Sequence, residues 1–575
     1  MKFRWSLAPP QPLLAGQLAA AQKISPLLAQ CLLNRGLSEP AVIEHFLSPR
    51  LKHLADPFLL PNMEVAIARL LRAHEQNEPL VIFGDYDVDG VTSTTILLEV
   101  LRTLGWSVEA YLPRRMEEGY GLSRDGVENC LKKFPMKLLL AVDCGSTAVE
   151  TIAWLRERDV DVIVLDHHQV SDPAPAAVAL VNPQLTKNSK LTTQNFTELC
   201  SAGLAFKLAH ALVKRGRESG LAGAAEYDVR QLLDLVALGT IADLVPLTGE
   251  NRILVSVGLE RLNTTQRPGL IALKQVAGVP EKLGAFEVGF QLAPRLNASG
   301  RLETAAQSLH LLLAPDLETA LPLAQNLDLI NRERQKIERG IAETAIGVVR
   351  SKFDAQNDWV IVEGELLWHI VVVGIVASRV LAEFYRPTII IGGENGEMRG
   401  SGRSIVGFDL AAALRQCDDL LVKHGGHAMA AGLSIAPEKI DLLRTRLNEI
   451  ARHTLKQENL QPPLRLDAEV NLKEINLDSL AELDRLKPMG QGNPTTQFFA
   501  RGLIQARPVQ RMGADKQHVK MWVKADAIKH EVVWWGAGDK SLPEGKFDLA
   551  FAPSINEFNG RRTVQLKFLD WRPAE

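Results

Sequence analysis

Residues 80–90, LVIFGDYDVDG, decide the fold class of this chain. The run Leu80–Gly84 has the apolar character of a buried strand, and residues 91–104 have the pattern of a helix. Further apolar runs lie at residues 108–112, 137–142 and 161–165, with helix-like segments between them. Because short strands alternate with helices, the sequence predicts an α/β domain built on a parallel sheet with crossover helices.

Three aspartates come directly after the first predicted strand. Asp85, Asp87 and Asp89 occupy alternate positions, and alternate side chains of an extended segment share one face. Three carboxylates on one face repel one another unless a cation lies among them. Ligands of parallel sheets also collect beyond the carboxyl ends of the strands. The sequence therefore predicts a cation site at this edge of the sheet.

Three further segments are predicted to bring ligands to the same edge. They are VDCGS with Asp143, LDHHQ with Asp166, His167 and His168, and GTIADLVPL with Asp243. A single aspartate after a strand is ordinarily a turn or helix cap, but four such segments at successive strand ends indicate a metal site. Carboxylates and imidazoles without an evident thiolate ligand favour Mg²⁺ or Mn²⁺ over structural zinc.

The rest of the chain divides into regions with different patterns of polar and apolar residues. Residues 315–356 are polar with charges at helical spacing and predict a connecting helix, and a second α/β pattern follows from residue 359 to residue 453. After QPPL (461–464) the runs 518–523, 531–535, 547–552 and 563–568 predict short strands. Several short strands in a small region indicate a barrel or a sandwich.

Composition restricts the class of protein. A chain of 575 residues is long enough for several domains. The net charge of −3 gives no global basic excess, but a local basic channel is what binds nucleic acid. The five cysteines are scattered without a CxxC pair, which argues against a zinc ribbon and for reduced thiols. With neither a long apolar run nor an apolar signal core, we expect a cytoplasmic protein without membrane contact.

The motifs resemble those of a known superfamily. GDYDVDGVTSTT, VDCGS, LDHH and GTIADLVPL are similar to the successive motifs of the DHH phosphoesterases. Together with APRLNASGR (293–301), GSGRSIVGFDL (400–410), GGHAMAAG (425–432) and GQGNP (490–494), they resemble the RecJ family of single-strand-specific exonucleases. The resemblance implies an N-terminal segment (1–60) packed on a DHH catalytic domain (61–314), a linking helix (315–356), a DHHA1 domain (357–456) and a single-strand-binding OB-fold (462–575).

The resemblance also implies an activity and a set of ligands. The family hydrolyses single-stranded DNA from its 5′ end and releases nucleoside 5′-monophosphates, in recombination and repair. Two divalent cations, Mn²⁺ or Mg²⁺, and no organic cofactor are implied. Asp143 is expected to bridge the ions, and Asp166 completes the namesake motif. The residues that match the family's metal ligands are Asp87, Asp89, Asp143, His167 and Asp243, and Asp85 and His168 complete the implied catalytic set.

A second set of residues is expected to bind the strand. Arg115 and Arg301 are candidates for holding a terminal 5′-phosphate, because a planar guanidinium pairs with phosphate through two hydrogen bonds. In the second α/β domain the candidates are Ser401, Arg403, Ser404 and His427. Tryptophans among lysines and arginines after residue 462 predict base stacking combined with phosphate neutralisation. A single-strand-binding protein and a helicase are the protein partners that fit this family.

One position departs from the family pattern, and other functions remain open. Val371 stands in WHIVVVGIVASR where the family usually has glycine, and a β-branched residue does not readily take a positive φ. The nearest alternative is a DHH phosphodiesterase of short oligonucleotides or cyclic dinucleotides. An inactive scaffold and a metal-dependent pyrophosphatase are further alternatives. The full set of ligands argues against a scaffold, and the predicted barrel argues against substrates as small as dinucleotides or pyrophosphate.

Overall fold

A computed structural model describes residues 3–186, 196, 198–302, 304–394, 397–538 and 540–574. Within these ranges, the side chains it leaves undescribed are those of Arg115, Met116, Thr186, Leu302, Glu394 and Glu397. The chain forms two compact units. One unit comprises residues 12–331 and 481–495, and the other comprises residues 1–11, 332–480 and 496–575. We call them the catalytic unit and the barrel unit.

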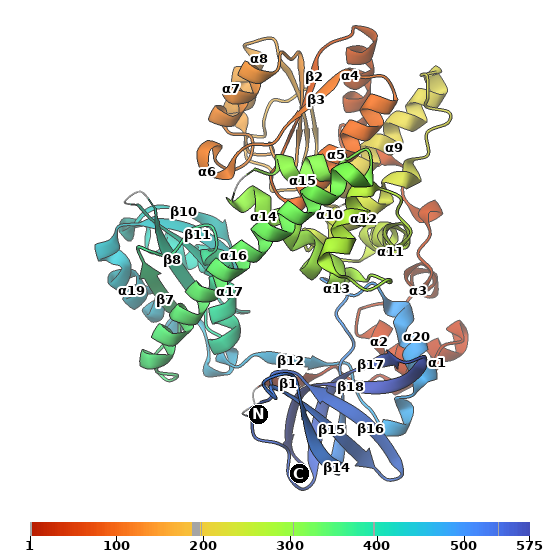
Figure 1. Cartoon of the computed structure of the whole chain (residues 1–575), viewed down its shortest axis with the longest axis vertical. Helices are drawn as coiled ribbons and strands as arrows, with labels where there is room; N and C mark the ends of the chain where they lie inside the picture. The colour runs from red at the N-terminus through yellow and green to blue at the C-terminus, as the bar shows by residue number, and fades with distance from the viewer. Residues whose placement is uncertain are drawn as a thin grey trace. The chain divides into compact units, whose positions relative to one another are not determined.

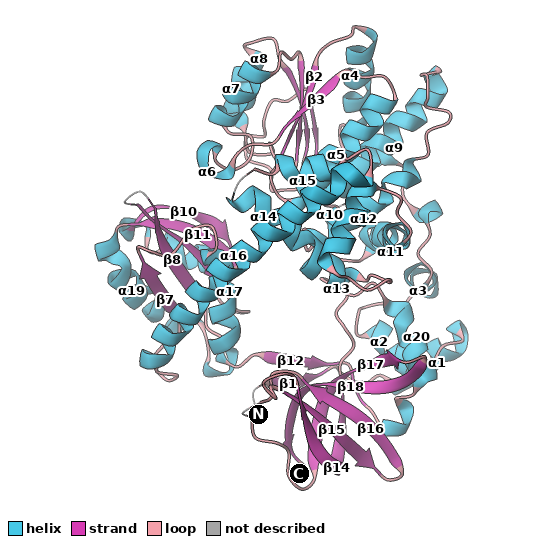
Figure 2. Ribbon diagram, viewed as in Figure 1, coloured by secondary structure: helices cyan, strands magenta, loops and turns pink. Residues whose placement is uncertain are grey.

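The catalytic unit is built on a parallel sheet of five strands in the order β3-β2-β4-β5-β6. Figures 1 and 2 show this sheet with helices on both sides of it. The strands are β2 (Leu80–Gly84), β3 (Val108–Tyr111), β4 (Leu138–Val142), β5 (Asp161–Leu165) and β6 (Ala179–Val181). Every residue of β2 and β4 is buried, because helices cover both faces of the sheet. The prediction of a parallel α/β domain is confirmed.

Alternate residues of β2 pack into two different cores. Leu80 and Ile82 join a large core with α4 (Met63–Glu75), α5 (Val88–Thr103) and α9 (Ser201–Ser219). Val81 and Phe83 point to the opposite face, where they pack on α7 (Arg124–Lys133) and α8 (Val149–Arg156). The catalytic unit is therefore a three-layer α/β structure, with the sheet between two layers of helices.

Many more helices extend the large core. The elements that bear on the site are α10 (Leu233–Ala242), α11 (Gly249–Asn263), α12 (Pro268–Ala277), the π-helical turn η5 (Val288–Leu292), α14 (Ala293–Leu302) and α15 (Ala306–Leu312). Helices α1 (Pro12–Gln22), α2 (Pro26–Leu33) and α3 (Pro40–Leu47) precede the domain. Helix α16 (Leu317–Lys352) contributes residues to both units, and it matches the expected connecting helix.

The barrel unit contains a second sheet, ordered β10-β11-β9-β8-β7. Its strands are β7 (Ile361–Glu365), β8 (Thr388–Glu394), β9 (Glu397–Arg403), β10 (Leu421–His427) and β11 (Ala430–Ile435). Helices α17 (Val373–Phe384), α18 (Leu410–Arg415) and α19 (Ile440–Thr454) belong to this α/β domain. Its core includes Val362, Ile389, Leu433 and Leu447.

The C-terminal region is a closed barrel, which confirms the predicted OB-fold. Strands β14, β15, β16, β18 and β17 pair in that order, and β14 also pairs with β17. They are β14 (Phe498–Met512), β15 (His518–Ala525), β16 (Ile528–Trp534), β17 (Phe547–Phe558) and β18 (Arg561–Pro573). The sequence predicted the last four as shorter strands. It did not predict β14, which contains three arginines and no long apolar run.

The first strand lies apart from the helices that follow it. Strand β1 (Arg4–Leu7) pairs in parallel with β12 (Pro463–Leu466). Trp5 packs against Phe499 of the barrel and donates its indole N–H to Asp570 over 2.9 Å. Residues 1–11 thus differ from the expectation that all of residues 1–60 pack on the catalytic domain, because Trp5 has its partners in the barrel unit.

Among the described helices, none has the length and apolar content needed to cross a membrane.

Candidate metal centre and phosphate-binding residues

The turn after β2 places its aspartates in two directions. Asp85 precedes the helix, Asp87 is the N-cap of α5 and accepts a hydrogen bond from Gly90 N over 3.1 Å, and Asp89 lies in the first helical turn. A Cβ at Gly90 would lie 2.5 Å from the carbonyl oxygen of Asp85, so the tight turn requires glycine. The prediction of one extended segment with all three carboxylates on one face is wrong, because the helix begins at Val88.

Helix α9 holds two of the carboxylates. Asp89 accepts hydrogen bonds from the backbone amides of Ser201 (2.7 Å) and Ala202 (2.8 Å) at the start of this helix. The hydroxyl of Ser201 donates to Asp143 Oδ1 over 2.8 Å. Both aspartates and Ser201 are buried. Burial raises the pKa of Asp89 and of Asp143, and neighbouring carboxylates add to both effects.

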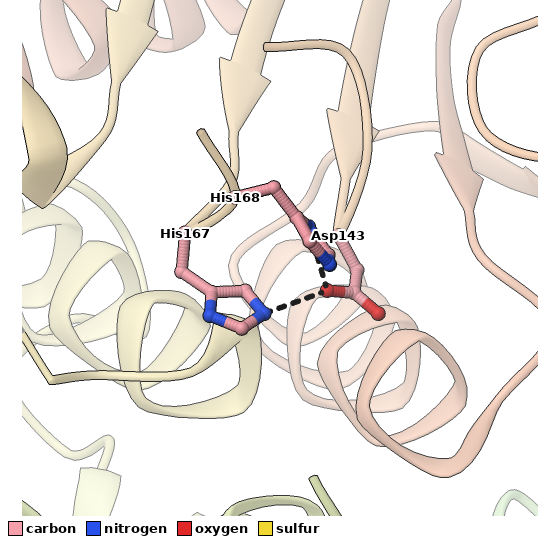
Figure 3. Close-up of side chains that lie close together, drawn as sticks. All are labelled: Asp143, His167 and His168. Atoms are coloured by element: carbon pink, nitrogen blue, oxygen red, sulfur yellow. Dashed lines mark ion pairs between the residues drawn. The ribbon is translucent and has the colours of Figure 1, made fainter. Parts of the chain in front are cut away.

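His167 lies among three carboxylates. Its Nε2 is 3.5 Å from Asp143 Oδ1, 3.6 Å from Asp243 Oδ2 and 3.9 Å from Asp89 Oδ2. Figure 3 shows His167 and His168 approaching the same oxygen of Asp143. Burial lowers the pKa of His167, which favours the neutral imidazole that binds metals.

Asp166 and His168 form a tight pair beside this group. Asp166 accepts hydrogen bonds from Ser146 N (3.0 Å) and from His168 Nδ1 (2.7 Å). Burial opposes ionisation of Asp166, but the bond and charge of His168 hold the pKa of Asp166 well below its usual range. Burial would likewise lower the pKa of His168, but Asp166 raises it to about 9. Asp166 therefore orients His168 and fixes which of its nitrogens faces outward.

Asp243 comes from a helix and not from a strand end. It is the C-terminal cap of α10, so the expectation that all four segments end strands of the sheet is wrong at this position. Burial and the charges of Asp89 and Asp87 raise the pKa of Asp243 to about 9. Helix α10 packs on α5 and α9. This packing places the C-terminal end of α10, and with it Asp243, beside His167.

The donors fall into three overlapping groups. Asp85, Asp87 and Asp143 form one, Asp89, His167 and Asp243 form another, and Asp143, His167 and His168 form a third. Within each group, one ligand atom per residue lies within 4.8 Å of the others. Asp143 joins the first group to the third, and His167 joins the third to the second.

The donors also have the chemistry of a cation site. Buried His167 Nε2 and Asp243 Oδ2 accept or donate no hydrogen bond within the described residues. A buried polar atom without a partner is costly, and so is a group of ionised carboxylates without a counter-charge. Divalent cations relieve both costs, and oxygen donors with imidazole suit Mn²⁺ and Mg²⁺.

The sequence did not single out the residues that support these ligands. Asn182 donates to Ser146 Oγ (2.8 Å) and to the carbonyl oxygen of His168 (2.9 Å), and Gln184 donates to that of His167 (3.1 Å). Ser201 had a weak signal, because it stands at the start of a helical apolar pattern, CSAGLAF. No sequence signal indicated Asn182 and Gln184, because their hydrogen bonds depend on where the chain runs after β6.

One of the two arginine candidates belongs to a helix beside the turn that carries Asp85 and Asp87. Arg301 is half-buried near the end of α14. That helix contacts the turn twice: Asn297 Oδ1 accepts from Val88 N over 3.0 Å, and a Cβ at Gly300 would lie 2.5 Å from the carbonyl oxygen of Tyr86. Arg115 begins the short helix α6 (Arg115–Glu118), and its side chain lies outside the described part of the chain.

The candidates of the second α/β domain divide into a cluster and a turn residue. Arg403 and His427 lie on strands that flank β11, and both are register partners of Ala430. Arg403 donates to Ser401 Oγ over 3.0 Å. Ser404 is buried, and its hydroxyl donates to the carbonyl oxygen of Phe408 over 2.7 Å, which closes a turn. Ser401, Arg403 and His427 thus lie on the same face of the sheet, with β11 between His427 and the other two, whereas Ser404 closes a turn.

Val371 is accommodated without backbone strain. It is buried in the turn before α17, and it is not among the residues with positive φ. The concern that valine would have to take a glycine conformation at this position is therefore wrong. Gly374 in the same motif leaves room for two strand-binding candidates, because a Cβ there would lie 3.0 Å from Ser401 Oγ and 3.1 Å from an Arg403 nitrogen.

The barrel carries both core and surface aromatic residues. Trp534 stacks on Phe568 with ring centroids 3.8 Å apart. Trp522 has the cations of Arg507 and Lys520 within 5.5 Å and 5.6 Å of its ring centre. The side chains of Trp535 and Phe558 are exposed. The exposed rings are available to stack on bases.

Family models match the three domains in order. The model of the DHH family, N-terminal domain, matches residues 79–240, the DHHA1 domain matches residues 357–453, and the RecJ OB domain matches residues 466–570. A parallel sheet with an Asp–His centre at its strand ends, followed by these domains, defines a DHH phosphoesterase.

The curated and structural relatives give the particular family. The chain is 37% identical over 580 residues to the single-stranded-DNA-specific exonuclease RecJ of Bacillus subtilis, covering 100% of this chain and 71% of that protein. RecJ of Thermus thermophilus in complex with Mn²⁺ is 30% identical, with a TM-score of 0.83 over 100% of this chain and 80% of that one. The same protein in complex with Mg²⁺ gives a TM-score of 0.78 at 29% identity, over 100% of this chain and 79% of that one. The chain belongs to the RecJ family.

Proposed function

We propose that this chain is a 5′→3′ exonuclease of single-stranded DNA that hydrolyses phosphodiesters with two divalent cations and releases nucleoside 5′-monophosphates. The observation that carries the proposal is the buried centre in which Asp143 is shared between neighbouring groups of metal donors. The relatives named as single-stranded-DNA-specific exonucleases support the choice of substrate. A role in DNA recombination and repair accords with that activity.

Each ion is assigned to residues of this chain. Asp85, Asp87 and Asp143 would hold one ion, and Asp89, Asp143, His167 and Asp243 would hold the other. His168 lies at the rim, where its bond to Asp166 leaves Nε2 facing the hydroxyl of Tyr120 at 3.4 Å. Ions bound at such a site activate water and stabilise the attacking and leaving oxygens of an in-line displacement.

The protein's own contribution is to fix and shield the ligands. The amides of α9 orient Asp89, and the one from Ala202 opposes the rise in its pKa that burial causes, while Ser201 aims one oxygen of Asp143. Asp166 keeps the ring of His168 in one orientation. Since these partners are in place before any substrate arrives, little reorganisation is required when the reaction occurs.

The remaining candidate residues are assigned to the strand. Arg301 and Arg115 would bind the terminal 5′-phosphate, and Ser401, Arg403 and His427 would bind phosphates further along. The barrel would guide a single strand by stacking bases on exposed rings, because bases in a duplex keep their faces hidden. A single-strand-binding protein and a helicase would supply and present such strands.

End-labelled DNA tests the proposal. Single strands labelled at either end, a blunt duplex, a duplex with a 5′ tail and a dinucleotide are incubated with Mn²⁺, Mg²⁺ or EDTA. We expect mononucleotides from the 5′ end first, no cleavage in EDTA, poor attack on the blunt duplex and restored attack on the tailed one. Release from the 3′ end, or a dinucleotide as the best substrate, would contradict the proposal and favour the small-substrate alternative.

A further inference from the structure

The motif GQGNP (490–494) has no role in the centre described above, yet it belongs to the catalytic unit. Residues 481–495 pack with that unit although more than two hundred residues separate them from Asp243 in the sequence. The loop lies after α20 (Leu477–Leu483) and before the first long strand of the barrel.

Buried polar side chains hold this loop. Arg252 of α11 is 2% exposed and donates to the carbonyl oxygens of Arg485 (3.0 Å), Leu486 (2.9 Å) and Lys487 (2.8 Å). Fully buried Asn493 donates to those of Leu486 (2.7 Å) and Pro488 (2.8 Å). A loop with so many hydrogen bonds to buried groups is rigid, and losing any partner leaves a buried polar atom unsatisfied.

The held loop packs directly on the segment that follows Asp243. The amide of Leu247 donates to the carbonyl oxygen of Gln491 over 2.8 Å. Gly492 has φ +72, and a Cβ there would lie 2.9 Å from Pro246 Cβ. A Cβ at Gly490 would lie 2.7 Å from Leu247 Cδ1. Gly492 is therefore required by its positive φ together with its contact with Pro246, and a side chain at Gly490 would force Leu247 to move.

Asp243 depends on this contact more than the other ligands do. Asp87, Asp89 and Asp143 each accept a hydrogen bond that orients the carboxylate, whereas the buried Oδ2 of Asp243 accepts none within the described residues. With no such hydrogen bond among the described residues, the direction of this oxygen depends on the backbone between the end of α10 and Leu244, which takes φ +61. A left-handed leucine is unfavourable and persists only where the surrounding structure holds it.

We propose that the GQGNP loop is a positioning element for the metal centre, which holds residues 244–247 and thereby aims Asp243 at its ion. The inference rests on the two-cation site of the proposed function. It gives a role in metal binding to a segment that contributes no ligand, and it makes Gly492 and Gly490 positioning residues.

Mn²⁺ binding by the full-length protein tests the inference. Isothermal titration calorimetry measures the Mn²⁺ affinity of wild type, Gly492→Ala and the control Gly278→Ala. Gly278 also has a positive φ (+61) and lies in the catalytic unit, but no atom lies within 4 Å of a Cβ added there. We expect Gly492→Ala to bind Mn²⁺ about tenfold more weakly. Cleavage should recover when the Mn²⁺ concentration is raised. Gly278→Ala should keep wild-type affinity despite a comparable backbone strain.

The titrations distinguish a failure of the proposed function from a failure of the positioning role. If wild type binds no Mn²⁺, the proposed function fails and the inference fails with it. If wild type binds but Gly492→Ala binds equally well, only the positioning role is overturned. If Gly492→Ala does not fold, Gly490→Ala takes its place in the titration, because it adds a close contact at a position without positive φ. A weaker Mn²⁺ affinity in Gly490→Ala than in Gly278→Ala supports the positioning role, and an equal affinity overturns it.

Discussion

At the scale of single residues, the shared ligand is placed by an unusual backbone. Asp143 takes φ +62 directly after β4, a conformation that aspartate and asparagine tolerate better than most residues. It turns the carboxylate back toward Ser201 and His167. A substitution at this position therefore tests the charge cleanly only if the new residue accepts the same backbone.

Asp143→Asn should abolish cleavage while leaving strand binding largely intact. The amide keeps the shape and the left-handed backbone but removes the charge that two ions would share, so turnover should fall by about two orders of magnitude or more. Asp159→Asn is the matched control, since Asp159 has φ +56 in an exposed turn of the same unit. Cleavage rates and strand affinity in EDTA are measured, and near-normal turnover by Asp143→Asn would refute the shared ligand.

Arg301→Ala should reduce the preference for a 5′-phosphate. A guanidinium on α14, the helix that contacts the turn after β2, can pair with a terminal phosphate. Wild type should degrade 5′-phosphorylated strands faster than 5′-hydroxyl strands, and the variant should degrade both at similar rates. Arg339→Ala removes an exposed arginine of α16 and should keep the preference. An unchanged ratio in Arg301→Ala would assign this arginine to another role.

At the scale of elements, the centre is the meeting point of three helices. A Cβ at Gly239 of α10 would lie 2.4 Å from Thr92 Oγ1 of α5, 2.6 Å from Ala202 Cβ of α9 and 3.0 Å from Asp89 Oδ1. Gly239 thus lets the helices that carry Asp89, its capping amides and Asp243 approach closely. Element packing and ligand geometry are coupled at this one position.

Gly239→Ala should lower both stability and metal affinity. Overpacking of this kind costs about 1–3 kcal/mol, and relief by helix displacement would move Asp89 away from its amides. Gly347→Ala is the control: this exposed position of α16 has no atom within 4 Å of an added Cβ, so it should gain stability of about 0.5–1 kcal/mol. Urea unfolding and Mn²⁺ titration measure the two effects, and wild-type Mn²⁺ affinity in Gly239→Ala would show that they are separable.

At the scale of the whole molecule, the order of the chain does not follow the order of the compact units. The catalytic unit takes residues 481–495 from beyond the second α/β domain, and the barrel unit takes residues 1–11 from the N-terminus. Buried Arg252 needs the carbonyl oxygens of residues 485–487 to satisfy its guanidinium. A cut at residue 462 therefore removes part of the catalytic unit together with the barrel.

Two truncations should behave differently for this reason. Residues 1–495 should fold and cleave a 5-mer slowly but lose affinity for a 40-mer, since the stacking barrel is absent. Residues 1–461 should be less stable, because each unsatisfied buried group costs roughly 1–3 kcal/mol. Thermal unfolding, with binding and cleavage of both oligomers, measures the difference. Equal stability of the two forms would contradict the role of Arg252, and equal loss on both oligomers would mean that the barrel supports the fold instead of guiding the strand.

The sequence by itself determined the fold class and singled out every residue of the three groups that could hold a metal ion. Apolar runs at strand length gave the buried strands β2, β4 and β5, and the aspartates and histidines after them were found at their ends. This succeeds because the side-chain pattern of a buried strand is local, and because every parallel strand ends at the same edge of its sheet.

Only the tertiary structure decided how the donors are shared and what holds them. Asp89 belongs to a different donor group from Asp85 and Asp87 because helix α5 begins at Val88, between Asp87 and Asp89. Asp243 reaches the site because it caps the C-terminal end of α10. Ser201 and the GQGNP loop act on ligands that lie more than fifty residues away in sequence. Such contacts depend on which surfaces pack together, and packing is a property of distant segments that no local pattern encodes.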